Sequence, residues 1–258
     1  MPDSSTRLYD TDFYAAQSNE SLRSARKVAP LILELLEVRS VVDVGGGVGP
    51  WVRAFLDAGV ERGLCIDGDY VDRSSLLIPA DRFLARNLAQ PLGVEERFDL
   101  AVSVEVAEHL PPSSSHAFVR ELVRLAPVVL FSAAIPLQGG VDHQNERWQS
   151  YWHALFAQEG YRAIDVVRPQ VWDDDDVTPF YAQNALLYAS ADAQFRKEPV
   201  APAGWPLDLV SPRFFEYQRS FIDNPPVRKA AQTLGTALLA SARSRAQRLL
   251  ESRGASRR

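Results

Sequence analysis

The segment SVVDVGGGVGPW, residues 40–51, restricts the possible folds of this chain more than any other part of the sequence. A short β-branched run contains Asp43, three consecutive glycines follow it, and an apolar helical pattern begins near Pro50. Glycine adopts the positive φ angles of tight turns and lets a ligand approach the main chain. The pattern predicts a buried strand, a glycine turn and a helix. In open α/β sheets, such a turn lies in the crevice at the carboxyl ends of the strands, where ligands bind.

Short apolar segments alternate with helical patterns along the rest of the chain. Strands rich in Val, Leu and Ile on both faces are typical of a parallel sheet covered by helices. We therefore expect an α/β fold with a doubly wound sheet, in which a loop without a helix joins an antiparallel last strand pair. The expected strands are 41–44, 63–67, 82–85, 98–105, 128–134, 161–169 and 183–190. The expected helices are 20–38, 49–59, 70–78, 113–126 and 147–160.

The sequence predicts four parts. These are an N-terminal helical cover (1–39), the ligand-binding α/β domain (40–190), a proline-rich linker (191–226) and a basic C-terminal helix or tail (227–258). Because this last part carries eight Lys or Arg and one Glu, the residues before it are more acidic than the net charge of −5 indicates. An acidic body does not suit a nucleic-acid-binding protein, which needs clustered Lys and Arg. The tail is expected to be a solvated surface helix, with docking to an anionic membrane or an acidic partner as the alternative.

Targeting and redox signals are few. The N-terminal residues lack the basic start and apolar core of a signal peptide, and the apolar runs are too short to span a bilayer. Cys65 is the single cysteine, so no internal disulfide is possible, and it has no partners at zinc-ligand spacing. We expect a cytoplasmic protein.

The glycine turn is compatible with two classes of nucleotide ligand. The dinucleotide fingerprint G-x-G-x-x-G fails, because Pro50 stands where the third glycine would lie after Gly45 and Gly47. Asp67 ends the second strand, twenty residues after Gly47, where a carboxylate can accept hydrogen bonds from both ribose hydroxyls. Together these features favour an adenosyl ligand over a dinucleotide.

The pattern Asp43-x-Gly45-x-Gly47-x-Gly49 resembles the first motif of the class I S-adenosylmethionine-dependent methyltransferases. The resemblance continues through RFLARNLAQPL and FDLAVSVEVAEHLPP, covers residues 20–190, and implies a Rossmann-like seven-stranded sheet with S-adenosylmethionine as cofactor. The aspartate and the bare glycine amides would face the ammonium and carboxylate of the methionine half. The other cofactor-binding residues that it implies are Asp67, Asn87, Leu88 and Glu105.

The acceptor is expected to be a small molecule. The sequence after the fourth strand, Glu105-Val106-Ala107-Glu108-His109, is not the Asp/Asn-Pro-Pro-aromatic sequence of amino-methylating DNA enzymes. Enzymes that methylate cytosine at carbon need a nucleophilic cysteine, whereas Cys65 lies inside the second strand and is expected to pack in the core. The loop after the fifth strand resembles that of some small-molecule methyltransferases, in which His-x-Asn-Glu precedes Tyr-Trp. For a hydroxyl acceptor, we expect His143 as the first candidate base and His109 as the second. The candidate acceptor-binding residues are Asp142, Asn145, Glu146, Trp172 and Tyr181.

Three alternatives remain open at this stage. The chain could be a nicotinamide-dependent oxidoreductase, although Pro50 and the absence of a Tyr-x-x-x-Lys pair disfavour this. It could bind the cofactor without catalysis, or act through its basic tail. A metal site of Asp142, His143 and Glu146 matches no familiar ligand spacing, so no metal is expected. The oligomeric state is not predictable from the sequence.

Overall fold

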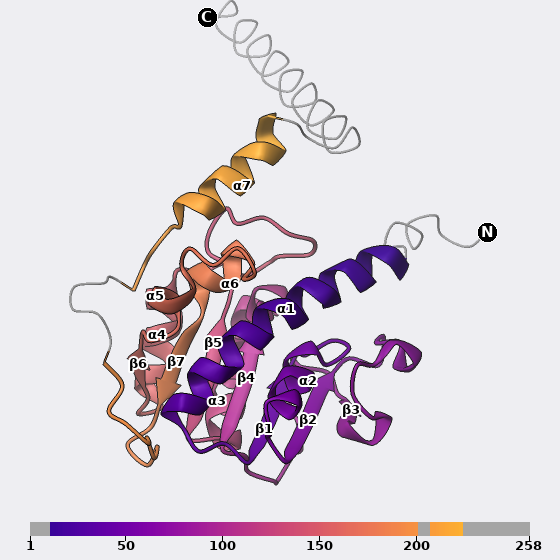
Figure 1. The fold of residues 1–258 in the computed structure, drawn as a ribbon, viewed down its shortest axis with the longest axis vertical. Helices are drawn as coiled ribbons and strands as arrows, with labels where there is room; N and C mark the ends of the chain where they lie inside the picture. The colour runs from indigo at the N-terminus through magenta and orange to yellow at the C-terminus, as the bar shows by residue number, and fades with distance from the viewer. Residues whose placement is uncertain (1–10, 201–206, 224–258) are drawn as a thin grey trace, which may run out of the picture. The chain divides into compact units, whose positions relative to one another are not determined.

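The computed structural model describes residues 11–200 and 207–223 of the chain, which divides into two units, Met1–Ser211 and Pro212–Arg258 (Figure 1). The first unit contains the sheet and most of the helices. In the second unit, α7 (Pro212–Asp223) is the described element. The basic part predicted at 227–258 lies outside the described residues.

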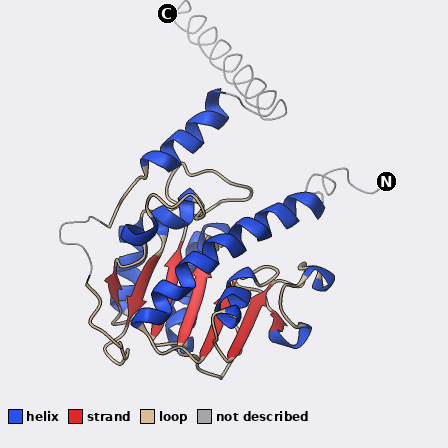
Figure 2. Ribbon diagram, viewed as in Figure 1, coloured by secondary structure: helices blue, strands red, loops and turns tan. Residues whose placement is uncertain are grey.

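The first unit is built on a seven-stranded sheet with the order β3-β2-β1-β4-β5-β7-β6 (Figure 2). β7 is antiparallel to both of its neighbours, β5 and β6, and the other pairings are parallel. The strands are β1 (Ser40–Val44), β2 (Arg62–Asp67), β3 (Phe83–Ala85), β4 (Leu100–Val104), β5 (Val128–Ser132), β6 (Arg162–Ile164) and β7 (Leu186–Ala189). The predicted fold class is confirmed.

Helices cover both faces of the sheet. The α-helices of this unit are α1 (Thr11–Leu35), α2 (Pro50–Asp57), α3 (Ser115–Leu125), α4 (Gln149–Gln158), α5 (Arg168–Val171) and α6 (Pro179–Asn184). One core cluster contains buried residues of α1, α2 and α6, a second contains those of α3 and α4, and a third, smaller one contains residues of α2, β2 and β3. Val128 and Leu130 of β5 belong to the first core and Val129 and Phe131 to the second, as the two-residue period of a strand requires. None of the helices among the described residues is long and apolar enough to cross a membrane.

Two predicted connections were wrong. Residues 70–78 form a 3₁₀ turn at Arg73–Ser75 instead of a helix, because the Asp72 carboxylate accepts the Ser74 N–H and begins a tight turn. The connection between the last two strands contains α5 and α6, where a loop without a helix was expected. Both helices have a proline in the first turn, a position that proline favours.

The predicted N-terminal helix and linker also differ in extent. α1 begins at Thr11, nine residues before the expected start, and ends at Leu35. Within the range predicted as a linker, Arg196 donates its N–H to Leu35 O at 2.8 Å, and Asp208 accepts the N–H and hydroxyl of Ser150. α7 lies in the same range.

Candidate functional site

The glycine turn joins β1 to α2 at the carboxyl edge of the sheet. Gly45, Gly47 and Gly49 have φ angles of 87°, 54° and 87°, in the region that favours glycine. A Cβ at Gly45 would lie 2.4 Å from a methyl of Val106, so the turn packs against the segment that follows β4. A Cβ at Gly47 would meet nothing within 4 Å. The turn therefore leaves open space on one side and contacts the β4 loop on the other.

Asp43 lies beneath this turn, near the end of β1. Its side chain is buried, and among the described residues Oδ2 has no hydrogen-bond partner. Burial, followed by the charge of Asp67, raises the pKa of the Asp43 carboxyl well above its ordinary value. An unpartnered buried carboxylate oxygen is costly. A cationic group of a ligand in the turn would remove this cost.

Asp67, at the end of β2, is bonded to the same turn. Its Oδ2 accepts the Gly47 N–H at 2.7 Å, and its Oδ1 accepts the Gly68 N–H at 2.6 Å and the hydroxyl of Tyr70. Because the carboxylate is fixed by the main chain, it is held in one orientation at the strand end. Tyr70 is 80% exposed, so its side chain can move to make way for ribose hydroxyls.

Asn87 and Leu88 follow β3, the next strand along this edge. Asn87 is exposed, and its Oδ1 accepts the Ala89 N–H at 3.0 Å, while Leu88 is half-buried. Arg86 donates its N–H to the main-chain oxygen of Asp67 at 2.7 Å. The two strand ends are therefore linked, and both predicted residues are close in sequence to this link.

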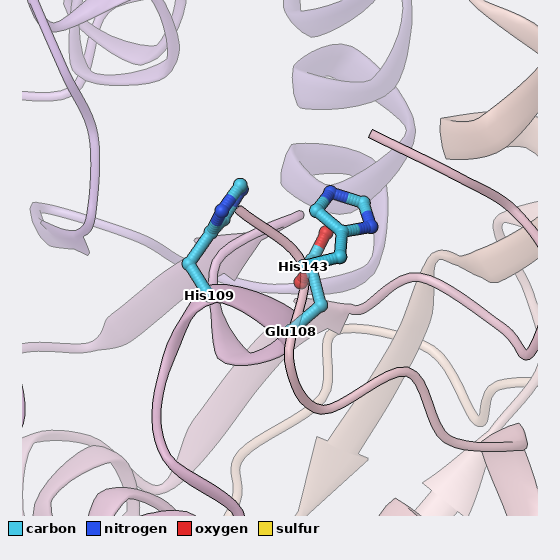
Figure 3. Close-up of side chains that lie close together, drawn as sticks. All are labelled: Glu108, His109 and His143. Carbon is cyan, nitrogen blue, oxygen red and sulfur yellow. The ribbon is translucent and has the colours of Figure 1, made fainter. Parts of the chain in front are cut away.

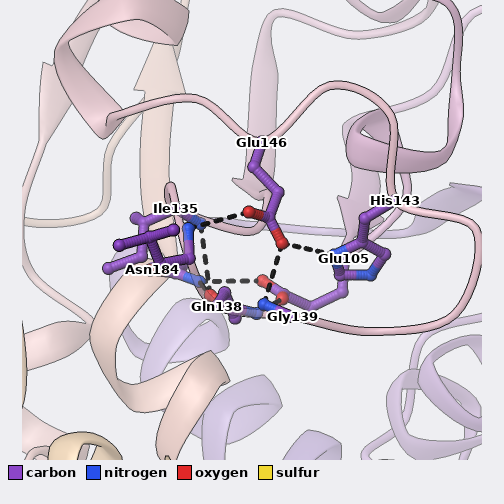
Figure 4. Close-up of polar contacts among 8 residues, drawn as sticks. Glu105, Ile135, Gln138, Gly139, His143, Glu146 and Asn184 are labelled. Carbon is purple, nitrogen blue, oxygen red and sulfur yellow. Dashed lines mark hydrogen bonds and ion pairs between the residues drawn. The ribbon is translucent and has the colours of Figure 1, made fainter. Parts of the chain in front are cut away.

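Glu105 follows β4 directly and has a φ angle of 54°, which is unusual for a residue with a side chain. Its N–H donates to Ser132 O at 3.0 Å, which holds the strand end in place. The amides of Gln138 and Asn184 donate to its two carboxylate oxygens at 2.5 Å and 3.2 Å (Figure 4). Burial raises the pKa of Glu105, and the hydrogen bonds from Ser132, Asn184 and Gln138 oppose this shift.

The two candidate bases meet at the ends of β4 and β5. His109 lies in the 3₁₀ turn Ala107–His109, and His143 lies in the loop between β5 and α4. Their ring centroids are 4.7 Å apart with an angle of 86° between the planes. His109 is exposed, yet desolvation of its ring by the surrounding protein, followed by the charge of the neighbouring His143, lowers its pKa. The structure therefore brings together two residues that the sequence proposed separately.

Glu146 orients His143. Its Oε1 lies 3.0 Å from His143 Nδ1, and its two oxygens also accept the N–H groups of Gly139 and Leu137, each at 2.8 Å (Figure 4). A carboxylate in this position favours a proton on Nδ1 and leaves Nε2 with a free lone pair.

Glu108 was not proposed from the sequence. It lies in the same 3₁₀ turn as His109, its side chain is fully buried, and neither carboxylate oxygen has a hydrogen-bond partner among the described residues. Burial and then the charge of Glu105 raise the pKa of Glu108 well above its ordinary value. The N–H groups of Glu108 itself and of Ala134 oppose the shift without reaching hydrogen-bonding geometry.

The remaining acceptor candidates lie in different environments. Asp142 is exposed, with a φ angle of 57°. Asn145 is buried, and its amide nitrogen donates to Ala107 O and Ser115 Oγ, so it joins two loops. Tyr181 is also buried, its hydroxyl lies 3.0 Å from the Ser21 hydroxyl, and burial raises its pKa. Trp172 is half-buried at the end of α5.

Sequence reasoning missed Glu108, Gln138 and Asn184. Glu108 is adjacent to His109, so its position after a buried strand was a usable signal. The two amides lie 33 and 79 residues from Glu105, and no local pattern relates them to it.

Comparisons with known proteins identify the family and the fold of the chain. A family model described as methyltransferase domain matches residues 14–168. None of the curated proteins is significantly similar to the chain in sequence.

Two solved structures share its fold. The pyocyanin biosynthetic protein PhzM is 16% identical, with a TM-score of 0.53 and coverage of 72% of this chain and 60% of that one. An O-methyltransferase family protein from Burkholderia thailandensis is 13% identical, with a TM-score of 0.53 and coverage of 70% and 60%. The matched part therefore spans less than two thirds of either protein.

Proposed function

Because this chain belongs to the methyltransferase domain family, we propose that it transfers the methyl group of S-adenosylmethionine to an oxygen atom of a small molecule. Its family and its seven-stranded sheet make it a class I S-adenosylmethionine-dependent methyltransferase. The proposal concerns the acceptor. The observation that carries it is the pair of imidazoles beside the cofactor turn, His109 and His143.

The residues of the glycine turn fit the cofactor. The unpartnered Oδ2 of Asp43 can face its ammonium, and the open space over Gly47 accommodates it close to the main chain. Asp67 would accept the ribose hydroxyls, while Asn87 and Leu88 would lie beside the adenine. The cofactor supplies a methyl group that is already activated as part of a sulfonium.

The acceptor site would lie next to this turn. Val106 packs against Gly45, and His109 is near enough to Asp67 for that charge to raise its pKa slightly against the larger opposing effects. Methyl transfer is an in-line displacement, so the protein mainly aligns the acceptor and excludes water. Val106 and the hydrogen-bonded network of Glu105, Gln138 and Asn184 would provide a rigid wall for that alignment.

His143 would take the proton of a hydroxyl acceptor. Glu146 orients its ring through Nδ1, so Nε2 can accept a proton as the oxygen forms its new bond to carbon. His109 lies against the same ring and is the second candidate. A positioned base contributes about 10²–10⁴-fold to such a step.

The test of the proposal identifies the acceptor. The full chain is incubated with S-adenosylmethionine that carries a carbon-13 methyl group and with a protein-free extract of small molecules. Labelled products are found by mass spectrometry, and their methyl carbon is then examined by nuclear magnetic resonance. We expect a labelled small molecule whose methyl carbon has the chemical shift of an ether or ester. A label found on nitrogen or carbon would contradict the proposal.

Variants of His143 then test its role with the identified acceptor. We expect His143→Ala to lower turnover by about 10²–10⁴-fold with nearly unchanged cofactor affinity, because the cofactor residues lie on other strands. His143→Gln keeps a hydrogen-bonding group without a base. If Gln restores activity, His143 only positions the acceptor.

A further inference from the structure

We infer that Glu108, His109 and His143 bind a divalent cation of the Mn²⁺ to Zn²⁺ series, with open coordination positions facing the acceptor. This inference deepens the proposed function and rests on it for the identity of the acceptor oxygen. The cation site itself is argued from the three side chains.

The three residues offer ligand atoms in one place. One ligand atom from each, a carboxylate oxygen and two ring nitrogens, lie within 4.8 Å of one another (Figure 3). A cation at 2.0–2.2 Å from each ligand requires separations of roughly 3–4 Å between them, so small side-chain movements would complete the site. The main chain is already fixed, because Glu108 O accepts the N–H groups of Gln144 and Asn145 at 2.9 Å and 3.0 Å.

The buried Glu108 carboxylate is the independent sign of a ligand. Its side chain is 0% exposed, and both oxygens lack a hydrogen-bond partner among the described residues. Buried carboxylates are normally paired, hydrogen-bonded or bound to a metal. Two further carboxylates, Glu105 and Glu146, make its environment more negative. A divalent cation would compensate this charge, which a neutral acceptor could not do.

Glu146 completes the pattern as an outer partner. Metal-binding histidines commonly donate their other ring N–H to a carboxylate, which fixes the ring and increases the basicity of the ligand. His143 has this arrangement, with Nδ1 3.0 Å from Glu146 Oε1. Its Nε2 is then free to bind the cation.

Two imidazoles and one carboxylate define the kind of ion. This donor set suits Zn²⁺, Fe²⁺ or Mn²⁺ and leaves positions open, whereas Mg²⁺ and Ca²⁺ prefer oxygen ligands. The inference differs from the set considered from the sequence, which was Asp142, His143 and Glu146. Glu108 and His109 lie within reach of His143, and Glu146 binds the ring of His143 as an outer partner.

A cation here changes the route of the proton. An acceptor hydroxyl bound to the cation loses its proton to solvent more easily, as metal-bound water does. The resulting oxygen anion forms a bond to the methyl carbon while the carbon–sulfur bond breaks and its electron pair stays on sulfur. With the cation bound, His143 is a ligand and does not take the proton itself; without the cation, it is the base proposed above.

Metal binding by the full chain tests the inference without any acceptor. The purified protein is stripped with a chelator and titrated with Mn²⁺, followed by electron paramagnetic resonance, and with Zn²⁺, followed by calorimetry. We expect one site per chain. Glu108→Gln and His143→Ala should each weaken binding at least tenfold, and Glu146→Gln by about 10–100-fold.

His116→Ala is the matched control, because His116 is an exposed histidine bonded to Glu159 on the α3–α4 side of the sheet. This variant should bind the cation as the wild type does, and a thermal melt confirms that each variant is folded. Binding that is absent, or that is unchanged in Glu108→Gln and His143→Ala, would overturn the inference.

The outcome is distinguishable from that of the proposed function. If oxygen methylation persists unchanged after the cation is stripped, the cation inference fails and the proposed function stands. If Mn²⁺ binds with the expected dependence on Glu108 and His143 but the methyl group goes to nitrogen or carbon, the cation site stands and the proposed acceptor atom fails.

Discussion

Replacing Asp67 with alanine should weaken cofactor binding by an amount that follows from its contacts. A carboxylate offers about four lone-pair positions. Gly47, Gly68 and Tyr70 occupy three of them. Two ribose hydroxyls would therefore take the fourth position and replace the Tyr70 hydroxyl, which gives one net new hydrogen bond.

A hydrogen bond to a charged group contributes about 1.5–3 kcal/mol. One net bond therefore corresponds to a dissociation constant about 10- to 150-fold higher in Asp67→Ala. Calorimetry with S-adenosylhomocysteine measures this change. The dissociation constant of Asp67→Asn, which keeps one acceptor oxygen, should lie between those of Asp67→Ala and the wild type.

Asp69→Ala is the matched control, because Asp69 is an exposed acid two residues away. The affinity of Asp69→Ala for S-adenosylhomocysteine should equal that of the wild type. The loss of the bond to Gly47 should also lower the melting temperature of Asp67→Ala by several degrees, at about 2–4 °C per kcal/mol for a chain of this size. A folded Asp67→Ala protein with unchanged affinity would refute the assignment of this acid to the ribose.

Four further substitutions test the same crevice. Because the buried Asp43 has a raised pKa in the folded state, its ionisation lowers the stability of the protein as pH rises through that pKa. Asp43→Asn should therefore melt at a higher temperature than the wild type at mildly alkaline pH and at the same temperature at strongly acidic pH. The same variant should bind S-adenosylmethionine more weakly in calorimetry. Gly45→Ala should lower the melting temperature strongly, since the φ of Gly45 is 87° and a side chain lies 2.4 Å from the new methyl. Gly47→Ala should fold, at a cost of about 1–2 kcal/mol in stability, and should lose cofactor affinity in calorimetry. Tyr70→Phe removes the competitor for Asp67 and should tighten cofactor binding by the same factor of about 10- to 150-fold, so weaker binding would show that Tyr70 contacts the cofactor.

The sheet and the cofactor turn could be predicted because their signals are local. The β-branched run, the glycines and Asp67 all lie within one strand-turn-helix-strand unit, and the remaining strands alternate with helices in chain order. α5 and α6 could not be predicted in this way, since helices of four and six residues are too short to show a period. Arg168, the first residue of α5, is buried, and its guanidinium donates to Asp165 and to Leu207 O. Leu207 is 39 residues away in sequence, so no local pattern predicts this contact.

The acceptor side was predicted only in part for the same reason. His109 and His143 were identified by residue type, but their contact depends on the order of β4 and β5 in the sheet. Glu108 is buried in the fold, and its residue type alone does not predict this, because glutamates are mostly exposed. Asn145, expected to contact the acceptor, joins two loops through Ala107 and Ser115.

Calorimetric titration of the full chain with S-adenosylhomocysteine and, separately, with NAD tests the central claim most directly. A methyltransferase crevice built from the glycine turn and Asp67 predicts one-to-one binding of S-adenosylhomocysteine and no heat of binding with NAD. Binding of NAD without binding of S-adenosylhomocysteine would contradict the assignment of the crevice and the function derived from it.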